Sequence, residues 1–161
     1  MLKPIDIIEE LTLIKFGIRM NTFSEKLLIQ FVDQIIKKED VPDYLYLEIS
    51  TSSKHQIIDE LENFTLTNKD LINESKLIEI VSYMFENNLL NIENTIMLLY
   101  KMNNEFDFGE NNCQEIHRLD DQYHLVSKGH VNQTILELES ELVDFFSKQK
   151  KTSVNLEILK K

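Results

Sequence analysis

The sequence is poor in the residues that cross-link or interrupt a chain. Its 161 residues include one cysteine, three glycines and two prolines. The lone thiol of Cys113 cannot form an internal disulfide, which indicates that the fold does not depend on an oxidising compartment. So little glycine and proline is typical of a helical protein rather than of a sheet with many turns.

The chain also lacks long hydrophobic runs. The longest, Ile96 to Tyr100, spans five residues, whereas a membrane-spanning helix needs about 18 or more. The first residues meet Asp6 at once, with no apolar stretch of the kind found in a signal peptide. We therefore expect a cytoplasmic protein that does not contact the membrane.

Catalytic signatures are missing as well. There is no glycine-rich phosphate loop, no Gly-x-Ser-x-Gly, no Cys-x-x-Cys and no His-Glu-x-x-His. A calcium loop centred on Gly109 would need oxygen ligands where Phe106 and Phe108 stand. The sequence therefore predicts a protein that is not an enzyme and that needs no cofactor.

Apolar residues recur at helical spacing along most of the chain. Leu28, Val32 and Ile35 share one helix face, and the same period returns in later segments up to about residue 148. We predict an all-α protein, a compact single-domain bundle or irregular array of about seven helices over residues 1–161, in which 150–161 form a frayed tail.

Some helix boundaries can be drawn from the pattern in more than one way. Near the N-terminus we expect a helix to about Leu13 and then an irregular or extended piece through Gly17, because Ile14, Phe16 and Ile18 alternate as in a strand. Residues 43–48 suit a helical turn or a strand. Residues 67–70 resemble the start of a helix that runs to about residue 87, and Gly129 suits a left-handed helix end.

The charge is strongly negative and uneven. The formal net charge is −11. Residues 40–147 carry 21 acidic and six basic residues, whereas residues 145–161 carry five lysines and one glutamate. Such a surface serves solubility, and it also attracts basic partners while repelling nucleic acid and anionic lipid.

The acidic residues that follow the middle of the chain give a candidate binding surface. They lie in an expected loop and on the last two expected helices, and together would form one carboxylate-rich face if these segments are neighbours. The candidate partner-binding residues are Glu105, Asp107, Glu110, Asp120, Asp121, Glu137, Glu141 and Asp144. Such a face suits the lysines and arginines that a nuclease uses to bind phosphate.

One stripe has residues that bind zinc. Cys113, His117, Asp120 and His124 fall on one side of an expected helix. Four ligands from one helix rarely close a tetrahedron, and the stripe borders an apolar face, so we interpret it as a polar border and predict no metal site. A thiolate–imidazole nucleophile at Cys113 and His117 would lack an orienting group and oxyanion donors.

The first quarter of the chain carries a family resemblance. The stretch Ile14 to Ile18, followed by Thr22-Phe23-Ser24 and the apolar helix at 28–36, is similar to the opening of a bacterial helical family. The chain thus resembles the small acidic immunity proteins of contact-dependent inhibition and polymorphic toxin systems. The resemblance implies a cytoplasmic, non-enzymatic inhibitor that binds a cognate toxin domain and occludes its active site.

Two other functions remain open. A helical adaptor or regulatory subunit, which includes a homodimeric interaction protein, would use a surplus apolar face. A metal-binding protein built on the helix from Cys113 to His124 is the other alternative.

Overall fold

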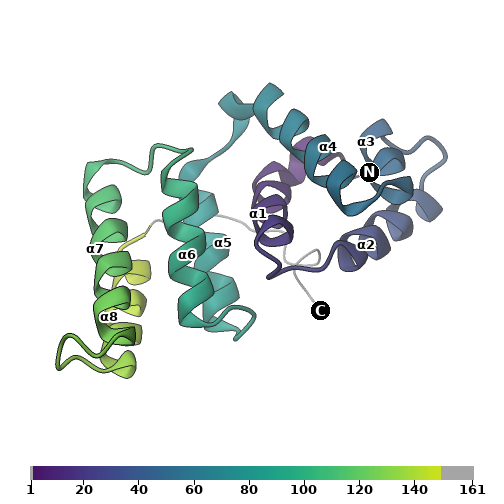
Figure 1. The fold of residues 1–161 in the computed structure, drawn as a ribbon. Coiled ribbons are helices and arrows are strands. Elements are labelled where there is room, and N and C mark those ends of the chain that lie inside the picture. Colours follow the sequence, from purple (N-terminus) through teal and green to yellow (C-terminus); the bar gives the residue numbers. More distant parts are fainter. Residues whose placement is uncertain (1, 150–161) are drawn as a thin grey trace. The chain divides into compact units, whose positions relative to one another are not determined.

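The structure is a computed structural model, and it describes residues 2–149. Within that range the chain forms eight α-helices and two short 3-10 helices, with no strand (Figure 1). This confirms the prediction of an all-α protein with about seven helices. The predicted frayed tail at 150–161 lies outside the described residues.

The elements follow one another with short connections. They are η1 (Pro4–Ile7), α1 (Ile8–Arg19), α2 (Glu25–Lys38), α3 (Tyr44–Thr51), α4 (Lys54–Thr67), η2 (Lys69–Leu71), α5 (Glu74–Glu86), α6 (Ile92–Asn103), α7 (Glu110–Ser127) and α8 (Ile135–Ser147).

The described chain divides into two compact units, residues 2–73 and residues 74–149. The first contains α1 to α4 and the second α5 to α8. One domain spanning residues 1–161 stays a prediction.

In the first unit α1 packs against α4, and α3 packs against both α2 and α4. Every residue of α1 from Ile8 to Ile18 is buried, so the expected end of this helix near Leu13 is wrong. A helix that is buried all round carries apolar residues on all its faces. The alternation of Ile14, Phe16 and Ile18 therefore reflects burial and not a strand.

Gly17 lets the chain turn closely at the end of α1. The backbone N–H groups of Thr22 and Phe23 donate to its carbonyl at 2.8 and 3.1 Å. A Cβ at this position would lie 2.9 Å from Cβ of Phe23, closer than real Cβ atoms approach. In this structure the Gly17 and Thr22-Phe23 stretch, part of the immunity-family resemblance, has a structural role in joining α1 to α2.

Side-chain caps set several helix starts. Ser24 accepts from the Lys26 N–H at 3.2 Å, and Asn91 accepts from the Asn94 N–H at 2.7 Å. Asp43 accepts from the Leu45 N–H at 2.9 Å, and the residues after it form helix α3 rather than a strand. A short polar side chain before an apolar period is a local signal that the sequence shows directly.

The expected helix start near residue 70 is wrong. Helix α4 continues to Thr67, and α5 begins only at Glu74. The side-chain amide of Asn68 donates to the carbonyl of Phe64 at 2.8 Å. Asn68 therefore closes the C-terminal end of α4 and does not cap the start of the next helix.

The second unit is a ring of four helices. Helix α5 packs against α6, α6 against α7, α7 against α8, and α8 against α5. Their shared core is aliphatic and aromatic, and its residues include Leu77, Val81, Ile96, Leu99, Ile116, Leu119, Leu138, Leu142 and Phe146. Burying these side chains is the main force that holds the unit together.

Candidate functional site

Helices α7 and α8 position most of the candidate acidic residues. Ile116 and Leu119 of α7 are buried, as are Leu138 and Leu142 of α8, and the two helices lie side by side (Figure 1). Gly129 adopts a left-handed φ of 71° and ends α7, as predicted. The Thr134 hydroxyl accepts from the Glu137 N–H at 3.2 Å and starts α8.

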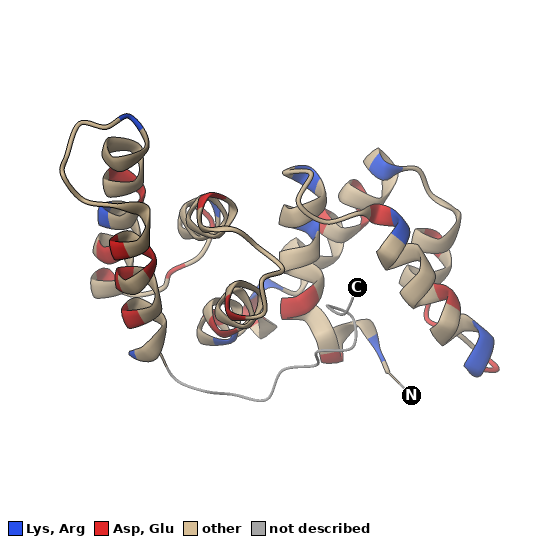
Figure 2. Ribbon diagram, turned by 90° about the horizontal axis from the view of Figure 1, so that it is seen from below, with Lys and Arg blue, Asp and Glu red and all other residues tan. Residues whose placement is uncertain are grey.

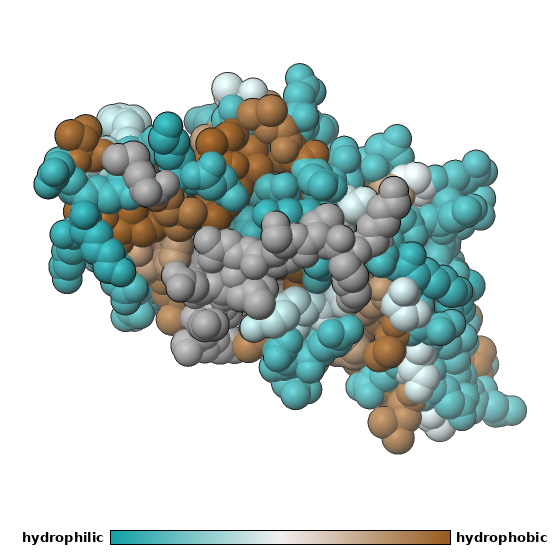
Figure 3. Space-filling view, turned by 180° about the vertical axis from the view of Figure 1, so that it is seen from behind, coloured by the Kyte–Doolittle hydropathy of each residue, from teal (hydrophilic) through white to brown (hydrophobic). Residues whose placement is uncertain are grey.

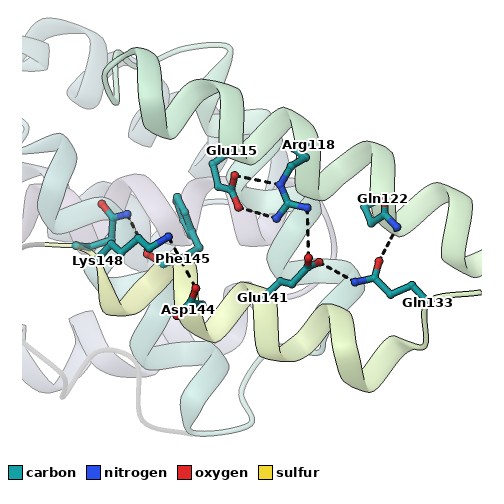
Figure 4. Close-up of polar contacts among 9 residues, drawn as sticks. Glu115, Arg118, Gln122, Gln133, Glu141, Asp144, Phe145 and Lys148 are labelled. Carbon is teal, nitrogen blue, oxygen red and sulfur yellow. Dashed lines mark hydrogen bonds and ion pairs between the residues drawn. The ribbon is translucent and has the colours of Figure 1, made fainter.

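A polar ladder joins the two helices along one edge (Figure 4). Arg118 donates to both carboxylate oxygens of Glu115, at 3.1 and 2.6 Å. Its other terminal nitrogen lies 3.5 Å from Glu141 on α8. Gln133 then donates to the second oxygen of Glu141 at 2.9 Å, and its carbonyl accepts from Gln122.

Charges along the ladder stabilise one another. The hydrogen bond and positive charge of Arg118 outweigh the effect of burial and lower the pKa of Glu115 below its ordinary value. The hydrogen bond and charge of Glu115, with a smaller contribution from Glu141, raise the pKa of Arg118. Glu141 is thus a bridging group whose charge is partly balanced within the protein.

Glu137 and Asp144 differ from Glu141, because both are exposed on α8. Asp144 lies 3.8 Å from the ammonium of Lys148, and both side chains are more than 70 % exposed. An ion pair that open to water is worth only about 0–1 kcal/mol. These two carboxylates therefore remain accessible to a partner.

The structure does not bring Asp120 onto the same face. Arg118 points toward α8 (Figure 4), and Asp120 follows it by two residues, or about 200° around the helix. Asp120 thus lies on the opposite side of α7. Asp121 is exposed and, three residues after Arg118, lies only about 60° around the helix from it. Of the two aspartates, only Asp120 is therefore turned away from the α8 carboxylates.

The loop between α6 and α7 presents its acidic residues outward. Phe106 and Phe108 are 8 % and 7 % exposed, whereas Glu105, Asp107 and Glu110 are exposed. Asp107 accepts from the Gly109 N–H at 2.9 Å and shapes the start of α7. The buried phenylalanines anchor the loop to the core and leave its carboxylates in solvent.

Glu110 lines a cleft of about 650 Å³ at the C-terminal end of α8. Its lining includes Glu110 and Glu115 from α7, and Phe145, Lys148 and Gln149 from α8 and the residues after it. The side-chain amides of Asn112 and Gln149 exchange hydrogen bonds of 3.3 and 3.1 Å across this end. Glu110 and Asp144 therefore lie at the same end of the α7–α8 pair.

Sequence reasoning did not single out Glu115 and Arg118, although they organise this surface. Their spacing of three residues is a signal for an intrahelical ion pair. The link from Arg118 to Glu141, in contrast, depends on how α7 and α8 pack, which no local pattern shows.

The Cys113 to His124 stripe borders the contact with α6. Cys113 accepts from the side-chain amide of Asn103 at 3.3 Å. The His117 ring meets the Tyr100 ring edge-on, with centroids 5.3 Å apart. Among residues 2–149, no three His, Cys, Asp or Glu side chains gather closely enough to hold a metal ion.

Acidic residues are spread over helices throughout the described chain, and several lie on the α7–α8 pair (Figure 2). In the second unit, residues 74–149 contain fourteen acidic and five basic residues. In the first, residues 2–73 contain thirteen acidic and eight basic residues. The excess of carboxylates is therefore larger in the second unit.

Comparisons with known proteins give no relative for this chain. No family model, curated protein or solved structure matches it. In the part of the chain that the structure describes, no helix is both long enough and apolar enough to cross a membrane.

Proposed function

We propose that this chain is an immunity protein, which binds a cognate bacterial toxin domain and neutralises it by occlusion. The observation that carries the proposal is the charge balance of residues 74–149, where acidic residues outnumber basic ones nearly three to one. Arg118 and Lys148 of this unit pair with carboxylates of the same unit. A basic toxin domain, such as a nuclease, is the partner that this surface would attract.

The mechanism we infer is electrostatic steering followed by steric occlusion. Exposed carboxylates on α8 and on the α6–α7 loop would meet the lysines and arginines with which a nuclease binds phosphate. Facing potentials of opposite sign raise association rates by factors of about 10 to 1,000, and salt weakens the effect. Function of this kind needs no catalytic residue in this chain.

A helical adaptor or regulatory subunit is the second candidate. The observation that favours it is exposed apolar surface in the first unit, where Val41 and Tyr44 are 78 % and 71 % exposed. Figure 3 shows hydrophobic side chains (brown) at the surface among hydrophilic ones on one face of the molecule. A stable homodimer without any toxin partner would support this function.

The test is neutralisation of a toxin domain encoded beside this gene. The C-terminal domain of the upstream neighbouring protein is expressed alone and together with this chain. We expect growth arrest in the first case and full growth in the second, with a one-to-one complex. If growth stays arrested although both proteins are soluble, the immunity proposal is wrong.

Charge reversal then tests the surface. The double variant Glu137→Lys, Asp144→Lys should slow association about tenfold at 20 mM salt, and the difference should shrink at 300 mM. Glu141 is left unchanged because it is part of the Arg118 ladder. The matched control is Asp59→Lys, Asp70→Lys, two exposed acids of the first unit. Equal slowing in both double variants would exclude the α8 surface.

A further inference from the structure

Helix α8 has two apolar stripes, and only one of them is buried. Leu138, Leu142 and Phe145 face the core. Leu136 and Val143 are 74 % and 47 % exposed, and they are seven residues apart, which places them on one side of the helix. The second stripe contributes little to holding the fold together, because most of its apolar area stays in water.

This second stripe forms one wall of a groove. The groove measures about 820 Å³ and lies between α8 and the turn that joins α5 to α6. Phe85, Leu90 and Ile92 line its other side. Apolar side chains from separate elements thus meet in a concave surface, which differs from single exposed apolar residues scattered over a protein.

The base of the groove is held by the core. Leu90 and Ile92 are 5 % and 9 % exposed. The centroids of the Phe85 ring and the Phe146 ring of α8 are 6.1 Å apart. The turn itself is closed by N–H groups of Leu89 and Leu90, which donate to the carbonyl of Met84 at 2.8 and 3.3 Å. The site is therefore preformed, and little free energy would be lost in ordering it when a ligand binds.

Among residues 2–149, the charged side chains that line the groove are both acidic, Glu86 and Glu139. The other lining groups are the neutral side chains of Asn88, Asn91 and Ser140. An apolar floor with carboxylates at the rim is complementary to a segment that is apolar on one side and cationic at its edges.

We propose that this groove binds an amphipathic helix whose apolar face carries large aliphatic side chains and whose borders carry lysine or arginine. Leu136, Ser140 and Val143 follow the spacing with which a helix face packs against another helix. The inference deepens the proposed function, because it gives the basic partner a specific docking element. It also adds a hydrophobic contact to the steering by carboxylates.

A second copy of this chain fits the groove less well. In a twofold dimer formed through α8, Glu139 of each copy would lie near the same region of the other. Each chain also has a net charge of −11. Like charges brought together in this way oppose association.

The test uses the purified full chain and a fluorescein-labelled 18-residue peptide of leucine and lysine arranged as an amphipathic helix. Fluorescence anisotropy measures its affinity. Two control peptides are used, one with the same composition in scrambled order and one with glutamate in place of lysine. We expect the first peptide to bind at least about tenfold more tightly than either control.

Protein variants then locate the site. Leu136→Asp should weaken binding about tenfold or more. The matched control Leu125→Asp changes an exposed leucine of α7 outside the groove and should leave the affinity within about twofold. Both variants add the same charge to the same unit, so only their position differs. Circular dichroism shows whether each variant keeps its helical content and thermal midpoint.

Several outcomes would overturn the inference. Equal binding of the acidic peptide would refute the charge requirement, and equal losses in Leu136→Asp and Leu125→Asp would refute the location. A concentration-dependent dimer that Leu136→Asp dissociates would assign the groove to a second copy. The assay contains no toxin, so its failure would leave the neutralisation test unaffected, and failure of neutralisation would leave the peptide result standing.

Discussion

Lys15 is the most deeply buried cation of the described chain that has a defined ion pair. Its ammonium is 2.9 Å from Glu62 of α4, and its side chain is 2 % exposed. Arg19, one turn later on α1, lies 3.0 Å from the same carboxylate. Glu62 therefore ties two residues of α1 to α4.

The pKa of Glu62 reflects this arrangement. Burial acts to raise it, but the hydrogen bonds and charges of Lys15 and Arg19 outweigh burial and lower the pKa below its ordinary value of 4.5. A carboxyl whose pKa is lower in the folded than in the unfolded chain stabilises the fold at pH values above its unfolded pKa. This stabilisation is lost as the pH falls through the folded pKa.

We predict that Glu62→Gln lowers the free energy of unfolding at pH 7 by about 1–3 kcal/mol, since Glu62 is partly exposed and so partly screened. Below about pH 4 the difference from the wild type should shrink, because protonation removes the same charge. Urea titrations from pH 3 to pH 7 measure both effects. Asp59→Asn, an exposed position on α4, serves as the control. A difference that does not depend on pH would contradict the charge interpretation.

At the scale of helices, asparagine takes the place of glycine at two helix ends. Asn21 and Asn88 have φ values of 60° and 57°, in the left-handed region. At the second end, the Asn88 N–H donates to Phe85 and the Leu89 N–H to Met84, at 3.1 and 2.8 Å. Gly129 ends α7 with the same pattern, because its own N–H donates to Val126 and the N–H of His130 donates to Leu125.

We predict that Asn88→Gly raises the free energy of unfolding by a few tenths to about 1 kcal/mol, because glycine adopts this conformation without strain. Asn88→Ala should lower it by about 1 kcal/mol. Urea denaturation followed by circular dichroism measures both. Asn63→Ala, in the exposed middle of α4, should be neutral or slightly stabilising. A neutral Asn88→Ala would show that the left-handed turn relaxes at no cost.

At the scale of the whole molecule, charge repulsion opposes folding. The net charge is −11, and the larger excess of carboxylates lies in residues 74–149. At 0.1 M, dissolved salt largely screens the repulsion between exposed charges that are more than about 10 Å apart. It also weakens exposed ion pairs such as Asp144 with Lys148, but these contribute little.

We therefore predict that the thermal midpoint at pH 7 rises by about 2–4 °C between 20 and 300 mM sodium chloride, which corresponds to about 1 kcal/mol in a protein of this size. Differential scanning calorimetry measures the shift. Potassium chloride in place of sodium chloride is the control for a specific ion effect. A midpoint that falls with salt would mean that ion pairs such as those of Glu62 outweigh the repulsion.

The sequence alone determined the features that depend on neighbours along the chain. The helical period and the left-handed end at Gly129 are encoded within a few residues, and the structure confirms both. The caps at Ser24 and Asn91 depend on equally short stretches of sequence. Local patterns gave the wrong helix boundary at two places, one where a helix is buried on all sides and one where a residue ends a helix instead of starting one. Helix α1 looked interrupted because it is buried all round, and Asn68 closes one helix where it seemed to start another.

The tertiary structure alone decided how residues from different helices meet. Most carboxylates are expected at the surface because a charge is costly to bury, but how they group there depends on helix packing. Packing therefore placed Asp120 away from α8, joined Arg118 to Glu141 and left Leu136 and Val143 beside Phe85 in a groove. Contacts between residues distant in sequence depend on the rotation of each helix about its axis. That rotation is set by the side chains of the whole core at once.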